Sequence, residues 1–128
     1  MLFINTRPQN RAKPLTVALQ QQSIEVIELP LLELISRPLS SELTHLYQQV
    51  FHVKIIVVVS PTAVEIGMKY LKQLDIPLAD LAHVKWIAVG QKTAESLQDY
   101  GIKSCIPDVE TSEGMLNLSV FKFLACGF

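Results

Sequence analysis

The stretch that decides the fold is Lys54–Val64, which reads KIIVVVSPTAV. Its five residues Ile55–Val59 are all β-branched, and such an unbroken run is typical of a parallel strand buried on both faces. We therefore expect a central strand over Lys54–Val59. Ser60-Pro61-Thr62 follows, with a hydroxyl suited to capping a helix and a proline suited to its first turn. The stretch predicts a strand-to-helix unit of a parallel sheet.

The same alternation of strand and helix recurs on both sides of this unit. Other strands are expected at Leu2–Asn5, Ser23–Leu29, Lys85–Val89 and Lys103–Ile106. Helices are expected at Asn10–Gln22 with Pro14 in its first turn, from the Ser40-Ser41-Glu42 cap to Val50, at Pro61–Leu74, at Leu78–Ala82, at Thr93–Tyr100 and from Ser112. Strands that alternate with helices indicate an α/β protein with a parallel sheet and right-handed crossovers.

Composition and charge exclude several classes of protein. The chain has 128 residues, of which 49% are hydrophobic and 18% charged, enough apolar mass for a core. A net charge of -1 argues against a wide basic surface for nucleic acid. The longest apolar run, Ile55–Val59, is too short to cross a membrane, and the N-terminus lacks a signal peptide. We expect a cytoplasmic protein in which Cys105 and Cys126 are reduced thiols.

The common catalytic and cofactor motifs are absent from the sequence. There is no GxGxxG, GxxxxGK[ST], HExxH or GxSxG, and His45, His52 and His83 are isolated, so no metal site is predicted. Ser60 follows the predicted central strand where a phospho-receiver domain would have an aspartate. Thr6–Gln9 replaces the glycine-rich loop of a flavodoxin. Both features disfavour a stand-alone receiver or flavodoxin domain.

Small hydroxyl residues gather where two strands end and helices begin, at Ser60–Val64 and Val89–Ala94. A third hydroxyl turn is Thr111-Ser112-Glu113. The carboxyl ends of parallel strands share one edge of a sheet, and free N–H groups at helix starts favour an anion there. The sequence thus predicts a site for a ligand with several carboxylates or phosphates, with positive charge from Arg7 and Lys92. In the alternative interpretation, the hydroxyls are simple helix caps and the two cations are solvated surface residues.

An ordered series of segments resembles the uroporphyrinogen-III synthase family of tetrapyrrole (haem) biosynthesis. The segments are FINTRP (Phe3–Pro8), EVIELP (Glu25–Pro30), IVVVSPTAV (Ile56–Val64), IAVGQKTA (Ile87–Ala94), Tyr100-Gly101-Ile102 and TSEGML (Thr111–Leu116). The family pattern has a strand ending in TRP, a strand ending in proline, TSP-x-AV, VG-x-x-TA, a helix-ending glycine and SEGL. The resemblance covers about residues 2–118.

The resemblance implies a fold of two flavodoxin-like α/β lobes, each a parallel sheet with flanking helices, joined by a two-stranded linker. Residues 1–31 would be a β-α-β piece of the first lobe, 32–38 a linker strand, 39–118 most of the second lobe, and 119–128 an atypical apolar tail. Family members are about twice as long, so we expect a truncated or frame-changed chain that is inactive on its own. The family is usually monomeric, whereas exposed sheet edges favour self-association of this chain.

The resemblance also implies an activity. The substrate would be hydroxymethylbilane, a linear tetrapyrrole with many acetate and propionate carboxylates, closed with inversion of ring D and without cofactor or metal. Ser60, Thr62, Gly90 and Thr93 match substrate-facing positions, and Arg7 matches the TRP turn. The family's tyrosine that assists hydroxyl departure matches none of this chain's tyrosines. Val59 replaces a hydroxyl or amide residue of the family. The alternative is a non-enzymatic α/β module that binds an anionic ligand or partner.

Overall fold

The computed structural model describes residues 1–119 and 121. The chain forms two compact units, Met1–Arg37 and Pro38–Phe128, and each is described by itself. Most of the predicted apolar tail, residues 119–128, lies outside the described residues, and so does Cys126. Cys105 is a free, exposed thiol.

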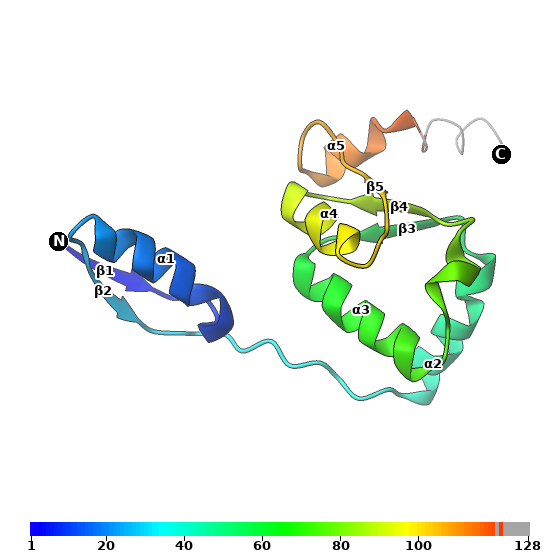
Figure 1. The fold of residues 1–128 in the computed structure, drawn as a ribbon, viewed down its shortest axis with the longest axis horizontal. Coiled ribbons are helices and arrows are strands. Elements are labelled where there is room, and N and C mark those ends of the chain that lie inside the picture. The colour runs from blue at the N-terminus through cyan, green and yellow to red at the C-terminus, as the bar shows by residue number, and fades with distance from the viewer. Residues whose placement is uncertain (120, 122–128) are drawn as a thin grey trace. The chain divides into compact units, whose positions relative to one another are not determined.

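The first unit is one β-α-β motif (Figure 1). It consists of β1 (Leu2–Asn5), α1 (Gln9–Gln21) and β2 (Glu25–Glu28), and the two strands pair in parallel. Asn5 ends β1 fully buried, and its Nδ2 donates to the carbonyl of Ala12 at 3.0 Å and to Oγ1 of Thr16 at 3.1 Å. These two bonds satisfy the buried amide and fix the end of β1 against α1.

Two details of this unit differ from the prediction. Helix α1 begins at Gln9, so Pro14 lies in its second turn rather than its first, and the carbonyl of Asn10 receives no N–H bond from it. Residues 29–40 form neither helix nor strand. The predicted linker strand over 32–38 is therefore not paired, because no described segment lies against it as a strand. A role for this segment between two lobes stays a prediction.

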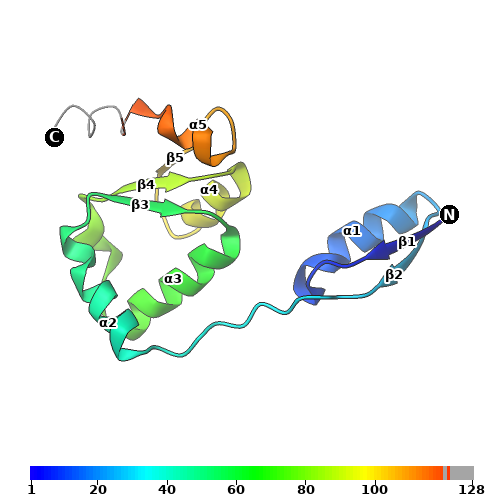
Figure 2. The same ribbon diagram turned by 180° about the vertical axis from the view of Figure 1, so that it is seen from behind.

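The second unit holds a three-stranded sheet in the order β3-β4-β5, with every pair parallel (Figure 2). Its elements are α2 (Ser41–Gln48), η1 (Gln49–His52), β3 (Ile55–Val58), α3 (Pro61–Gln73), η2 (Leu78–Leu81), β4 (Lys85–Ala88), α4 (Gln91–Gln98), β5 (Ser104–Cys105) and α5 (Ser112–Leu116). These elements confirm the predicted alternation of strands and helices, although β5 is shorter than expected.

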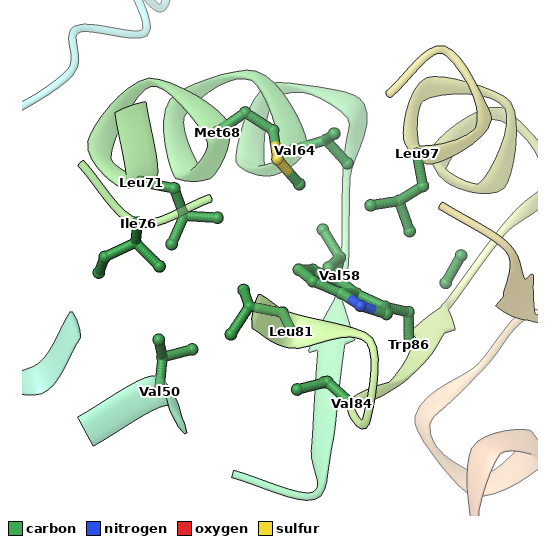
Figure 3. Packing of buried hydrophobic residues seen from close by; sticks show 11 residues of the cluster. Val50, Val58, Val64, Met68, Leu71, Ile76, Leu81, Val84, Trp86 and Leu97 are labelled. Atoms are coloured by element: carbon green, nitrogen blue, oxygen red, sulfur yellow. The ribbon is translucent and has the colours of Figure 1, made fainter. Parts of the chain in front are cut away.

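The hydrophobic core of this unit lies between the sheet and helices α3 and α4 (Figure 3). Val58 and Trp86 project from β3 and β4 toward Val64 and Met68 of α3, while Leu97 of α4 closes the cluster. Because side chains alternate along a strand, Ile87 points to the opposite face from Trp86, and it is also fully buried. The central strand β4 is therefore covered on both faces.

The strand KIIVVV is not central, contrary to the prediction. β3 stands at one edge of the sheet, and among the described residues no strand pairs with its other side. Val57 is 40% exposed and Val59 is 67% exposed, so the face away from α3 is open. The composition of β3 suits a buried strand, but the position of a strand in a sheet depends on partners that the local sequence does not reveal.

The turn after α4 contains Gly101, the one described glycine with a left-handed conformation, at φ +76°. Its N–H donates to the carbonyl of Gln98, and the next N–H reaches back to Leu97. In a left-handed conformation the Cβ of an alanine crowds the backbone, so Gly101→Ala should lower the unfolding free energy by about 1 kcal/mol. Gly67→Ala is the matched control: it lies inside α3, where the added Cβ meets only the Tyr47 hydroxyl at 3.7 Å.

Urea unfolding followed by the fluorescence of Trp86, the single tryptophan, measures both variants. Gly67→Ala should raise stability by about 0.5 kcal/mol, because alanine favours a helix interior over glycine. Equal losses in the two variants would contradict the assignment of Gly101 as the left-handed residue of the turn after α4.

Candidate functional site

A groove of about 490 Å³ lies at the carboxyl edge of the sheet in the second unit. It is lined by Val59, Val89, Gly90, Gln91, Lys92, Thr93 and Glu110. The structure thus brings together Gly90, Lys92 and Thr93 of the predicted site residues. Ser60 and Thr62 lie at the neighbouring strand end, next to Val59, but do not line the groove.

The first helix start beside this groove is that of α3. Ser60 has extended backbone angles, and its Oγ accepts the N–H of Ala63 at 3.1 Å. Pro61 occupies the first helical position, where its missing N–H costs nothing. The predicted capping role of Ser60 is confirmed. Its hydroxyl already serves one backbone donor, which limits what it offers a ligand.

The second helix start, that of α4, is built differently. Gly90 is the cap residue and has no side chain to accept a hydrogen bond. Instead the carboxylate of Glu110 accepts the N–H of Gln91 at 3.0 Å. A Cβ on Gly90 would lie 2.8 Å from Oε2 of Glu110, so the glycine makes room for this carboxylate. The backbone of Gly90, at φ −139° and ψ 165°, is ordinary extended chain that demands no glycine.

Glu110 is the site residue that sequence reasoning missed. It follows β5 in a loop, 19 residues from its partner, and no short motif links the two positions. The loop is held by α5, where Oγ1 of Thr111 caps the helix by accepting the N–H of Gly114 at 3.1 Å. Gly114 also packs directly against the carbonyl of Val109, where a Cβ would overlap it. These contacts place the carboxylate at the start of α4.

Lys92 and Thr93, two further predicted site residues of this unit, differ in how exposed they are to solvent. Lys92 is exposed, and its ammonium adds positive charge to the groove. Thr93 is only 3% exposed, because the helix begins at Gly90 and carries Thr93 into the first turn. The N–H of Thr93 donates to the carbonyl of Gly90 at 3.1 Å. Thr93 therefore supports the turn from inside, while Lys92 is open to a ligand.

Arg7 belongs to the first unit, in the turn after β1. Its backbone N–H donates to Oδ1 of Asn5 at 3.2 Å, and the residue is exposed. The turn is thereby tied to the buried Asn5 amide described above. Within the first unit, this bond fixes the backbone of Arg7 beside Asn5.

Neither the tyrosines nor the histidines add a reactive group to the groove. Tyr47 and Tyr70 pack edge to face with ring centroids 5.7 Å apart, and Tyr100 is exposed. Burial, and secondly the neighbouring Tyr70, raise the pKa of Tyr47 above its ordinary value, so its phenol stays protonated at neutral pH. Over residues 1–119 and 121, no cluster of three histidine, cysteine or acidic side chains could hold a metal ion. No helix in that part of the chain is long and apolar enough to cross a membrane.

Together the parallel sheet and the groove over its strand ends define an α/β protein with an open groove beside the starts of its helices. The chain belongs to the uroporphyrinogen-III synthase family. The family model described as uroporphyrinogen-III synthase HemD matches residues 13–122. This confirms the resemblance drawn from the ordered segments of the sequence.

Individual relatives agree with the family assignment. The chain is 28% identical over 99 residues to "Porphyrin biosynthesis protein HemD" of Ruminiclostridium josui, a match that covers 77% of this chain and 20% of the relative. Two solved structures share the fold. Uroporphyrinogen-III synthetase from Helicobacter pylori has a TM-score of 0.73 at 18% identity and covers 93% of this chain. The Thermus thermophilus synthase has a TM-score of 0.53 at 16% identity and covers 91%.

The chain spans only part of each of these proteins. It covers 52% of the Helicobacter pylori chain and 46% of the Thermus thermophilus chain. The α/β architecture is therefore part of the two-domain fold of these synthases.

Proposed function

We propose that this chain is part of a uroporphyrinogen-III synthase and that its groove holds carboxylates of hydroxymethylbilane during closure to uroporphyrinogen III. One observation carries the proposal: the Glu110 carboxylate already accepts a hydrogen bond from the Gln91 N–H, with Oε1 and N 3.0 Å apart. The start of α4 therefore has the geometry to accept a carboxylate. The N–H of the second helical residue, Lys92, also lacks an acceptor within the helix at such a position.

The proposed chemistry depends on positioning more than on reactive side chains. The bilane loses its hydroxyl as water, and the resulting azafulvene is reactive enough to close without an enzyme to the wrong isomer. Holding a flexible polyanion in one geometry selects the outcome. Backbone N–H groups bind carboxylates without a basic surface, which suits a net charge of -1. The proposed reaction uses no cofactor.

Within the proposal, the site residues have different roles. Gly90 gives a carboxylate access to the start of α4, and Lys92 supplies charge. Ser60 and Thr62 line the start of the neighbouring helix, while Thr93 supports the turn. Arg7, carried by the other unit, is a further candidate for a substrate carboxylate. We place the activity in the cytoplasm, as in the family, and assign the proton-donating tyrosine to the part of the fold outside this chain.

A non-enzymatic module that binds an anionic ligand is the second candidate, because the groove alone accounts for binding but not for closure. Analysis of the porphyrin isomers formed from hydroxymethylbilane separates the two when the chain is combined with the part of the Helicobacter pylori synthetase that it does not cover. A synthase raises the share of isomer III over spontaneous closure, whereas a binding module leaves that share unchanged.

Replacing Gln91 by proline tests the site directly. Proline suits the first helical position after extended Gly90, just as Pro61 follows extended Ser60, so α4 should remain intact. The variant lacks the N–H that meets Glu110. A hydrogen bond to a charged group is worth about 1.5–3 kcal/mol, so in a Glu110→Ala background, where no carboxylate of the chain competes for this N–H, affinity for a tetrapyrrole polycarboxylate should fall by about tenfold or more.

Calorimetric titration with uroporphyrin III, the oxidised form of the proposed product, measures this change. Gln91→Ala is the control, because it keeps the backbone N–H and loses only the side chain that reaches Glu95 at 3.3 Å. Equal affinities in the proline and alanine variants would exclude the start of α4 from the site.

A further inference from the structure

Asn5 lies at the centre of a hydrogen-bond network in the first unit. It is 1% exposed at the end of β1, and its Nδ2 donates to the carbonyl of Ala12 and to Oγ1 of Thr16. The Thr16 hydroxyl in turn donates to Oε1 of Glu28, the last residue of β2, at 2.6 Å. On the other side of the amide, Oδ1 of Asn5 accepts the N–H of Arg7 at 3.2 Å. One buried amide thus joins α1 and the end of β2 to the turn that carries Arg7.

The donors and acceptors around Asn5 determine which way its amide points. A hydroxyl has a single hydrogen, and Thr16 gives it to the Glu28 carboxylate, so the Thr16 oxygen can only accept from Asn5. The carbonyl of Ala12 can also only accept. Both neighbours therefore require the NH2 group, and the amide oxygen is left facing the Arg7 N–H. A side chain that lacks either the donor or the acceptor could not make this set of contacts.

The turn after β1 is held from two sides. The N–H of Leu31, beyond β2, donates to the carbonyl of Thr6 at 3.4 Å, and the Asn5 amide holds the N–H of Arg7. Pro8 follows with a ring-restricted φ of −49°, and α1 begins at the next residue. The backbone of Arg7 is therefore fixed. Its side chain is exposed at the carboxyl end of a parallel strand pair, where ligands of such sheets bind.

We propose that Asn5 is a positioning residue, whose buried amide fixes the turn so that Arg7 is placed for a carboxylate of the tetrapyrrole substrate. This role rests on the proposed function, in which Arg7 is a candidate for such a carboxylate. A cation that must first be ordered contributes less to binding, because ordering costs free energy. The Asn5 amide orders the backbone of Arg7 before the substrate arrives.

Replacing Asn5 by valine isolates the contact to the turn. The carbonyl of Ala12 keeps its ordinary partner within α1, and the Thr16 hydroxyl keeps the Glu28 carboxylate. Of the three groups that Asn5 meets, the N–H of Arg7 is the one that loses its partner within the chain. Valine also suits a strand. Asn5→Val should therefore leave the first unit folded and release the turn.

Calorimetric titration of the full chain with uroporphyrin III tests the proposal. Asn5→Val should weaken binding by about three- to tenfold, and Arg7→Ala by about tenfold. Because Asn5 acts through Arg7, the double variant should bind no more weakly than Arg7→Ala alone. Val26→Ala is the matched control: it removes apolar contacts from a half-buried position of β2 and leaves the Asn5 bonds in place, so affinity should stay within about twofold.

Spectra of the ¹⁵N-labelled variants check that the first unit is folded, and Asn5→Leu replaces Asn5→Val if it is not. Hydrogen exchange at the Arg7 amide should speed up by about tenfold when the Asn5 amide is lost. Unchanged affinity in Asn5→Val or in Arg7→Ala would overturn the proposal. Losses that multiply in the double variant would also overturn it, because they indicate a purely structural role for Asn5.

These outcomes are separate from the fate of the proposed function. A negative result for Asn5 or Arg7 leaves the titration of Gln91→Pro, in the second unit, as an independent test of that function. Absence of binding by the unmodified chain would overturn the proposed function, and the role of Asn5 with it.

Discussion

Leu97→Ala is expected to lower the unfolding free energy of the second unit by about 2–5 kcal/mol. Leu97 is 0% exposed and lies in α4, where it packs into the same cluster as Val58, Val64 and Trp86. Truncation removes apolar contacts and leaves a cavity that the neighbouring strand and helix cannot fully close. Because α4 begins at Gln91, directly after Gly90, the loss extends to the groove that these two residues line.

Urea unfolding monitored by Trp86 fluorescence measures the loss, since Trp86 belongs to the same cluster. Leu116→Ala is the control: Leu116 is 67% exposed in α5 and its truncation should change stability by less than about 0.5 kcal/mol. A loss for Leu97→Ala no larger than that of the control would contradict the core described here.

Glu110→Ala is expected to raise the affinity for uroporphyrin III by about tenfold. In the ligand-free chain the Glu110 carboxylate occupies the Gln91 N–H, so a bound carboxylate must displace it. It also repels an anion placed in the groove that it lines. Removing the side chain frees the donor and removes the negative charge, and the two changes act in the same direction.

Glu113→Ala is the matched control, because it removes one negative charge from the exposed first turn of α5 and Glu113 does not line the groove. Its effect should be small and should disappear at high salt, where exposed charges are screened. Calorimetric titration compares the two variants. Equal gains in both would assign the effect to net charge alone, and no gain in Glu110→Ala would contradict competition for the Gln91 N–H.

Local sequence patterns predicted much of this fold. The β-branched run before Ser60 and the apolar run before Gly90 mark β3 and β4, and the hydroxyls of Ser60 and Thr111 cap helices as expected. These features depend on residues a few positions apart, where backbone preference and capping chemistry decide the outcome. The family resemblance added the order in which they occur.

The features that the sequence did not predict depend on distant contacts. The edge position of β3 depends on which strands pair with it, and hydrophobicity alone cannot decide that. The Glu110 contact joins residues 19 positions apart through the fold of the α5 loop. The hydroxyl of Thr93 suggests a helix cap, but the cap residue of α4 is Gly90. Thr93 lies in the first turn of the helix and is buried.

In the proposed function, the start of α4, over the carboxyl edge of the sheet, receives a tetrapyrrole carboxylate. An NMR titration of the ¹⁵N-labelled chain with uroporphyrin III tests this binding residue by residue. We predict saturable binding, with the largest amide shifts at Gln91, Lys92 and Glu110. Shifts scattered over exposed lysines of both units, with no saturation and no change at Gln91, would contradict binding at the start of α4.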